Sequence, residues 1–270
     1  MRRLIAIENI KTFSSSTFRV ILSLHFLFFI LVVLSISRIE VSLGHFSIAR
    51  LYQFPNVWGF FSWVASWFNI LLSVLVIVLV CNEYRFFTFR QQIMNGLQER
   101  HLLLGKVYML FVIAVYALLL VVVSGIVAGI LSESGGFSLS SLTGFGEVMK
   151  YFLQTLAYMS MAMLFAVLLR NNGLTIVIFF LYLFPGEVII RSLIFPNAKE
   201  YFPAKIISDL TPLPSIFSDQ TANIQNMGMN MQTLPAKEAA MSSGLHAILV
   251  MGYIALFLLI TYLLLRRRTL

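Results

Sequence analysis

The sequence predicts an all-α integral membrane protein with six transmembrane helices, an N-terminal interfacial helix and an amphipathic helix between the second and third spans. Of its 270 residues, 59% are hydrophobic and only 11% are charged, whereas soluble domains carry about 25% charged residues. Because so few polar groups cannot cover a water-facing surface, a soluble enzyme or a disordered chain is excluded. With one cysteine, Cys81, an intrachain disulfide is impossible, which also excludes a secreted disulfide scaffold.

Six apolar runs predict the membrane spans, because each is long enough to cross about 30 Å of hydrocarbon as a helix. These runs are Val20–Ser37, Val57–Cys81, Val107–Leu131, Tyr151–Leu169, Leu174–Ile194 and Ala247–Leu265. Ser35-Ile36-Ser37 is similar to a signal-peptide cleavage site, but the preceding run is longer than a usual signal core. We therefore expect the first span to be retained, within a transmembrane domain covering residues 20–270.

The basic residues predict the orientation. With the N-terminus in the cytoplasm, inside segments hold 12 of the 19 lysines and arginines, and outside segments hold 7. The positive-inside rule favours this arrangement, with both termini cytoplasmic in the inner (plasma) membrane. Topology therefore accounts for the formal net charge of +8, and a nucleic-acid partner is not needed.

Residues 1–19 predict a helix that lies in the cytoplasmic membrane interface. Its apolar positions recur every three residues, and its polar positions fall opposite: Leu4, Ile7, Ile10 and Phe13 against Glu8, Asn9 and Thr12. A disordered basic tail is the alternative.

Residues 82–106 predict a cytoplasmic amphipathic helix. Phe86, Phe89, Ile93 and Leu97 form one stripe, and polar side chains cover the opposite face. A connection this long between neighbouring spans suggests that a partner docks there. A helix resting on lipid headgroups remains the alternative.

This stretch resembles the cytoplasmic loop of the ATP-binding-cassette type-2 permeases. The family's Glu, its Thr-containing turn, its Arg and its Gly-Lys match Glu83, Thr88, Arg100 and Gly105-Lys106, although the Pro common before the Arg is absent. The layout of six spans is also similar. The resemblance implies that the segment is a coupling helix, that the permease is a homodimer or heterodimer, and that a separate ATPase docks here. The implied docking residues are Glu83, Arg85, Thr88, Arg90, Glu99 and Arg100.

No nucleotide or metal site is predicted in this chain. The pattern G-x-x-x-x-G-K-[ST] is absent, so ATP and magnesium would bind to the partner ATPase. The four histidines, His25, His45, His101 and His246, fall in separate regions, and no catalytic motif accompanies them.

One face of the second span is polar. Ser62, Ser66, Asn69 and Ser73 recur at helical spacing, and polar groups in lipid must face protein or water. We expect this face, with Asn69 foremost and His25 beside it, to border a substrate path at the dimer interface. Small residues that permit tight helix packing are the alternative. Gly125 and Gly129 in the third span predict close packing, as do the Ala and Met residues of the fourth.

The fifth span is expected to break at Pro185-Gly186, with Glu187 and Arg191 paired as an external gate or as a plain salt bridge. Residues 195–244 are expected to form an external, partly re-entrant segment. Met227, Met229 and Met231 in it could bind Cu(I), but the lack of nearby His or Cys favours a flexible apolar surface.

The predicted function is the permease subunit of an ATP-driven exporter for an amphipathic or lipid-like substrate, and not an enzyme. The alternative is an integral membrane enzyme or assembly factor that uses the bundle as a scaffold. If the docking segment is correct, charge reversal at Arg90 or Glu99 will weaken ATPase association without unfolding the bundle.

Overall fold

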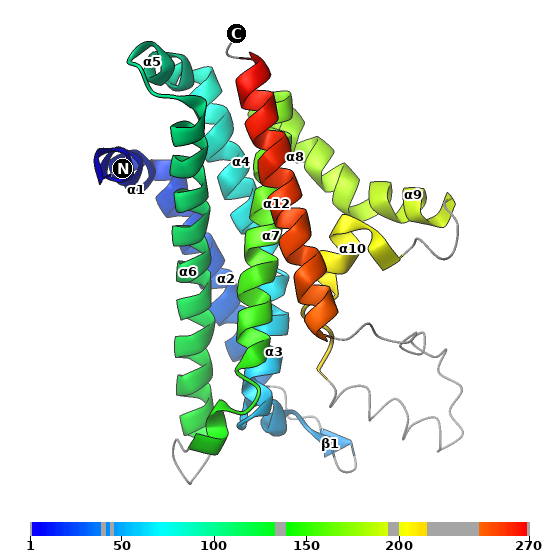
Figure 1. Cartoon of the computed structure of the whole chain (residues 1–270). Coiled ribbons are helices and arrows are strands. Elements are labelled where there is room, and N and C mark those ends of the chain that lie inside the picture. Colours follow the sequence, from blue (N-terminus) through cyan, green and yellow to red (C-terminus); the bar gives the residue numbers. More distant parts are fainter. Residues whose placement is uncertain are drawn as a thin grey trace.

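The structure is a computed structural model, and it describes residues 2–38, 42–43, 46–132, 139–193, 200–214 and 243–268. Helices make up nearly all of these residues (Figure 1). In chain order the elements are α1 (Arg2–Ser14), α2 (Ser16–Ser37), β1 (Ser42–Leu43), β2 (Phe46–Ser47), η1 (Ile48–Tyr52), α3 (Asn56–Ser66), α4 (Asn69–Arg85), α5 (Thr88–Met94), α6 (Glu99–Ser132), η2 (Leu139–Leu142), α7 (Gly146–Leu169), α8 (Asn172–Leu181), η3 (Tyr182–Gly186), α9 (Glu187–Leu193), α10 (Pro203–Ser208) and α12 (Ser243–Arg268). β1 and β2 form a small antiparallel hairpin, in which Ser42 pairs with Ser47.

Five helical segments in the described residues are long and apolar enough to cross a membrane. They are α2, α6, α7, the continuous segment Asn172–Leu193 and α12. The count rises to six if α3 and α4, which meet at a bend of 44°, form one broken span. The predicted apolar runs are therefore helical, and the membrane character of the chain follows from them.

The predicted second span, Val57–Cys81, is not one straight helix. It breaks at Trp67 and Phe68, whose backbone N–H groups donate to carbonyls only three residues back, at 3.3 and 3.0 Å. The hydroxyl of Ser66 donates to the carbonyl of Trp63 at 2.7 Å. Such local bonds compete with the regular hydrogen bonds of the helix and bend it. Hydropathy contains no information on these bonds, so the bend could not be predicted from it.

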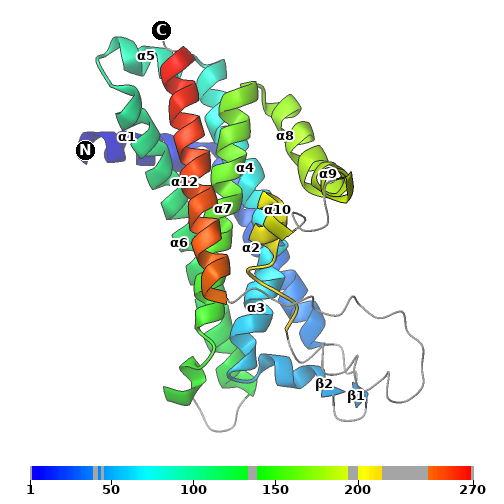
Figure 2. The ribbon, with the colours of Figure 1, turned by 45° about the vertical axis from the view of Figure 1, so that its right-hand side comes forward.

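α7 is the central helix of the bundle, in contact with α3, α4, α6, α8 and α12. Figures 1 and 2 show it surrounded by these helices from two directions. Its Met159, Met161, Met163, Ala162 and Ala166 are all buried. This burial confirms that the alanines and methionines of the fourth apolar run serve packing within the protomer.

Gly125 and Gly129 let α6 approach the start of α3. A Cβ atom on Gly125 would lie 3.0 Å from the ring of Trp58, and one on Gly129 would lie 2.2 Å from the ring of Phe54. The Gly-x-x-x-Gly pattern therefore packs against aromatic rings of the same chain.

Two segments depart from the bundle axis. α1 runs across the bundle, whereas α8 and α9 diverge from it on one side (Figures 1 and 2). The expected break at Pro185-Gly186 occurs as the single π-helical turn η3, which connects α8 to α9. Of the segment 195–244, only residues 200–214 and the start of α12 are described, and the three alternating methionines lie outside the described residues.

Candidate docking surface at the α5 end

α5 forms a compact tip at the end of the bundle that also carries the C-terminal end of α12 (Figure 1). α4 ends at Arg85, and Phe87 then takes a left-handed conformation with φ of 55°. The hydroxyl of Thr88 donates to the carbonyl of Glu83 at 3.2 Å. After α5, Gly96 has φ of 87°, a conformation that only glycine adopts without strain. Two tight turns therefore set α5 between α4 and α6.

A buried ion cluster lies beneath α5 and joins α1, α4 and α6. The ammonium group of Lys106 lies 2.8 Å from a carboxylate oxygen of Glu8 and 2.5 Å from one of Glu83. Lys11 also pairs with Glu83. Glu8, Glu83 and Lys106 are each at most 5% exposed. Buried charges persist only where they are paired, and two acids and two bases balance here.

The cluster corrects the predicted role of Glu83. Its carboxylate faces Lys106 and Lys11 inside the protomer, so it is not an exposed group that a docking protein could contact. The hydroxyl of Thr88 is likewise used within the chain. Both residues support the turn that precedes α5.

The cluster also determines which face of the N-terminal helix lies against the bundle. Glu8 and Thr12 on its polar face are buried, while Ile10 and Phe13 are 72% and 49% exposed. The side-chain amide of Asn9 donates to the Tyr108 hydroxyl at 3.2 Å. α1 therefore turns its polar face toward the bundle, because that face finds charged and hydroxyl partners there.

Aromatic rings connect this cluster to the turn between α7 and α8. The Lys106 ammonium lies 5.7 Å from the ring centre of Phe89, and Phe89 lies 4.7 Å from Tyr84. The guanidinium of Arg170 lies over Tyr84 at 4.9 Å. The two cation–ring distances are short enough for cation–π attraction, and together the contacts connect α5 to α4, to α6 and to the turn between α7 and α8.

Several side chains on the outer surface of the tip remain exposed. Phe86, Phe87 and Met94 are 63%, 65% and 73% exposed. Arg85, whose guanidinium lies 5.6 Å from the ring centre of Phe86, is also exposed, as is Arg100 at the start of α6. A groove of about 410 Å³ separates α1 from α5, lined by Ile10, Lys11, Thr88, Gln91, Gln92 and Asn95. The side chains of Arg90 and Glu99 lie outside the described part of the structure.

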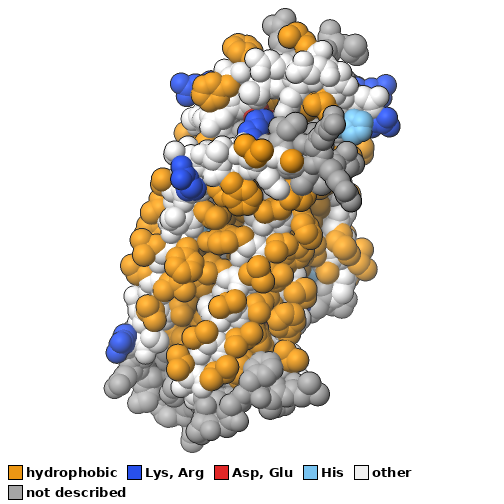
Figure 3. All heavy atoms as spheres, turned by 90° about the vertical axis from the view of Figure 1, so that its left-hand side faces the viewer, with side chains coloured by type: hydrophobic (Ala, Val, Ile, Leu, Met, Phe, Trp, Pro, Cys, Tyr) orange, Lys and Arg blue, Asp and Glu red, His pale blue; other side chains and the backbone are white. Residues whose placement is uncertain are grey.

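Basic side chains gather at this end. On the face shown in Figure 3, hydrophobic side chains cover the middle, and most of the visible lysines and arginines lie at the upper end, where α5 is located. An apolar belt with a basic end suits a bilayer and its headgroup region.

The polar face of the second span lies inside the protomer, which corrects its expected place at an open path. Asn69 is 1% exposed; its amide donates to Gln154 at 3.2 Å, and its carbonyl oxygen accepts from Thr155 at 2.9 Å. Ser73 donates to the Asn69 backbone carbonyl at 2.9 Å. Ser62 is also buried.

His25 is fully buried, and neither ring nitrogen has a hydrogen-bond partner among the described residues. Its ring lies 6.2 Å from Phe68 and 5.8 Å from Tyr116. It sits beside the break between α3 and α4, enclosed by aromatic rings and away from the bundle surface.

Gln154 was not among the residues predicted from the sequence for this region. Its side-chain amide donates to the carbonyls of Ile207 and Ser208 at 3.0 and 3.4 Å, and its oxygen accepts from Thr211 at 3.0 Å. The signal was available, because Gln154 is a lone amide in an apolar run, but its partners are more than 50 residues away.

Glu187 and Arg191 do not form the expected pair. Glu187 is 3% exposed, and its carboxylate accepts the backbone N–H groups of Ala204 and Lys205 at 2.9 and 2.7 Å. Two N–H donors at the start of α10 satisfy this carboxylate better than a solvated guanidinium could. The pair was predicted either as an external gate or as a plain salt bridge, but Glu187 instead anchors α10.

Comparison of the chain with family models gives no match, and comparison with curated proteins gives none either.

Proposed function

We propose that this chain is the permease subunit of an ATP-binding-cassette transporter of the type-2 family, in which α5 is the coupling helix that docks to a separate ATPase. In this proposal the permease forms a homodimer or heterodimer and exports an amphipathic or lipid-like substrate. The α5 end faces the cytoplasm, and the protein resides in the inner (plasma) membrane. ATP and magnesium bind the ATPase.

The observation that carries this proposal is the exposed surface of the α5 tip on a rigid support. Phe86 and Phe87 precede α5 and Met94 ends it, and all three are exposed. Arg85 lies over the ring of Phe86, and Arg100 is exposed at the start of α6. Aromatic anchors flanked by arginine are typical of protein interfaces. The ion cluster beneath the tip resists displacement, because breaking a buried ion pair costs about 3–5 kcal/mol.

The position of α1 favours a protein partner over lipid headgroups for α5. α1 exposes Ile10 and Phe13 and so suits the headgroup boundary of the bilayer. α5 lies nearer to the end of the bundle than α1 does (Figures 1 and 2). A helix beyond the boundary level meets water or a protein, and its exposed apolar side chains need a protein to cover them.

The proposed exporter still takes an amphipathic or lipid-like substrate, but the substrate path is no longer placed on the polar face of the second span. Because Asn69 and Ser73 are bonded inside the protomer, a path would have to use another face of the bundle. An amphipathic substrate remains the best match, since the apolar spans offer few fixed charges to stabilise a small ion.

Copurification tests the docking surface. We expect the tagged chain, purified from its native membranes, to retain an ATPase subunit in stoichiometric amount. Replacing both Phe86 and Met94 with Ser, or Arg100→Glu alone, should lower ATPase recovery about tenfold, the effect of losing an interface hot spot. Arg267→Glu is the matched control, an exposed arginine on the last turns of α12, and it should leave recovery unchanged.

Two results would contradict the proposal. The first is ATPase recovery that none of the α5 variants changes. The second is a correctly inserted chain that never binds an ATPase and has an activity of its own, which would favour the enzyme or assembly-factor alternative.

A further inference from the structure

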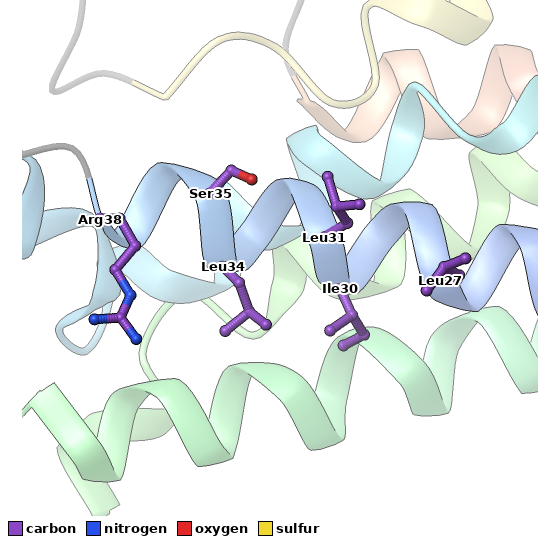
Figure 4. Close-up of a pocket in the computed structure, with 6 residues that line it drawn as sticks. All are labelled: Leu27, Ile30, Leu31, Leu34, Ser35 and Arg38. Carbon is purple, nitrogen blue, oxygen red and sulfur yellow. The ribbon is translucent and has the colours of Figure 1, made fainter.

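α2 carries a groove on its outer face, in the half of the bundle away from α5. The groove has a volume of about 440 Å³ and is lined by Leu27, Ile30, Leu31, Leu34, Ser35 and Arg38. Figure 4 shows Ile30, Leu34 and Arg38 extending from the same side of α2. At about 1.5 Å of helix rise per residue, the lining from Leu27 to Arg38 is roughly 16 Å long.

The leucine side chains that line this α2 groove are exposed on the surface of the bundle. Leu27, Leu31 and Leu34 are 55%, 51% and 58% exposed. Ile30 is partly buried and packs against the core of the bundle. Within an apolar helix that crosses a bilayer, exposed leucines of this kind contact acyl chains.

One end of the groove carries a positive charge. Arg38 caps the C-terminal end of α2 and is exposed. None of the ion pairs among the described residues includes Arg38. An arginine at the end of an apolar span extends to the headgroup level, and its guanidinium matches a phosphate through two parallel hydrogen bonds.

We propose that the α2 groove binds one anionic phospholipid of the leaflet opposite α5, with an acyl chain along Leu27–Leu34 and its phosphate on Arg38. The apolar side chains favour an acyl chain, and the guanidinium of Arg38 favours a headgroup with net negative charge over a zwitterionic one. A surface arginine contributes about 1 kcal/mol to such binding, which corresponds to about a fivefold preference. This site does not depend on the proposed ATPase partner.

Photo-crosslinking in lipid nanodiscs tests the site. The full chain is placed in phosphatidylcholine nanodiscs with a trace of photoactivatable phosphatidylglycerol or, in a parallel sample, of photoactivatable phosphatidylcholine. We expect the phosphatidylglycerol probe to label residues 27–38 about five times more than the phosphatidylcholine probe.

Four variants separate charge from shape. Arg38→Gln should remove the preference for phosphatidylglycerol, and Arg38→Lys should keep part of it, because lysine retains the charge without the bidentate geometry. Leu34→Trp should reduce labelling by both probes, because the larger ring fills the groove. Arg50→Gln is the control, an exposed arginine in η1 that does not line the groove, and it should change nothing.

Two outcomes would overturn the proposal. Equal labelling by both probes that is insensitive to Arg38→Gln would mean that only ordinary surrounding lipid is present. Disulfide crosslinking between two protomers through Leu31→Cys, in a chain that also carries Cys81→Ser, would mean that a second copy covers the groove instead.

Discussion

Lys106, on α6, contacts residues of three other helices at the α5 end. It pairs with Glu8 on α1 and Glu83 on α4, and it contacts Phe89 on α5. The neighbouring Gly105 permits this arrangement, because a Cβ there would lie 3.2 Å from the side chain of Glu8. The Gly-Lys pair therefore brings α1 and α6 together at this point.

Removing the Lys106 charge should destabilise the chain strongly. Lys106→Met leaves Glu8 without its partner in a buried site, at a cost of about 3–5 kcal/mol in the free energy of unfolding. Fluorescence-detected thermal unfolding in detergent measures the loss. The double variant Glu8→Gln, Lys106→Met should recover part of it, because the unpaired buried charge is then removed as well.

Lys150 provides the control for this prediction. It pairs with Glu147 at 2.6 Å, and the two side chains are 26% and 35% exposed. Lys150→Met should cost less than about 1 kcal/mol, since water screens an exposed pair. Equal losses in the two methionine variants would contradict a special role for the buried cluster.

Among the elements, α10 shows how a short helix is held by distant side chains. Its six residues could not form a stable helix alone. The carboxylate of Glu187 accepts hydrogen bonds from the first N–H groups of α10. The side chain of Gln154, on α7, donates to a carbonyl near the end of α10 and accepts a hydrogen bond from the Thr211 hydroxyl. Ile206 and Ile207 are fully buried. The anchoring comes from outside the element.

Gln154→Leu should release α10 from α7. The change leaves the carbonyls of Ile207 and Ser208 and the Thr211 hydroxyl without this partner, at about 1–3 kcal/mol for each buried group left unpaired. Hydrogen exchange measured by mass spectrometry should show faster exchange across residues 203–211. Gln91→Leu, on the exposed face of α5, should not alter exchange there. Unchanged exchange in Gln154→Leu would mean that apolar packing alone holds α10.

At the scale of the whole molecule, the basic α5 end and the apolar belt give the bundle a direction relative to the membrane. The proposed orientation places the α5 end in the cytoplasm. Cys81 is buried, so single cysteines can report which end faces which compartment. In a Cys81→Ser chain, Gln91→Cys should react with an impermeant thiol reagent only after the membrane is opened. Leu142→Cys, at the exposed last residue of η2, should react in intact cells. The reverse pattern would place α5 outside and exclude docking to a cytoplasmic ATPase.

The apolar runs could be recognised from the sequence because the free energy of transferring a segment into lipid is approximately the sum of the contributions of its residues. That sum identified the helices that became α2, α6, α7, α8–α9 and α12, and the polar interval that contains α5. The break at Pro185-Gly186 could also be predicted from the sequence, because proline has no N–H group to donate to the helical hydrogen bond.

The partners of polar groups were decided only by the tertiary structure. Glu83 was predicted to face a docking protein, Asn69 a substrate path and Glu187 an arginine four residues away; instead they bond to Lys106, Gln154 and the start of α10. A buried polar group must be satisfied wherever packing places it. Its partner comes from the helix that lies beside it in space, and spacing along one helix cannot identify that neighbour.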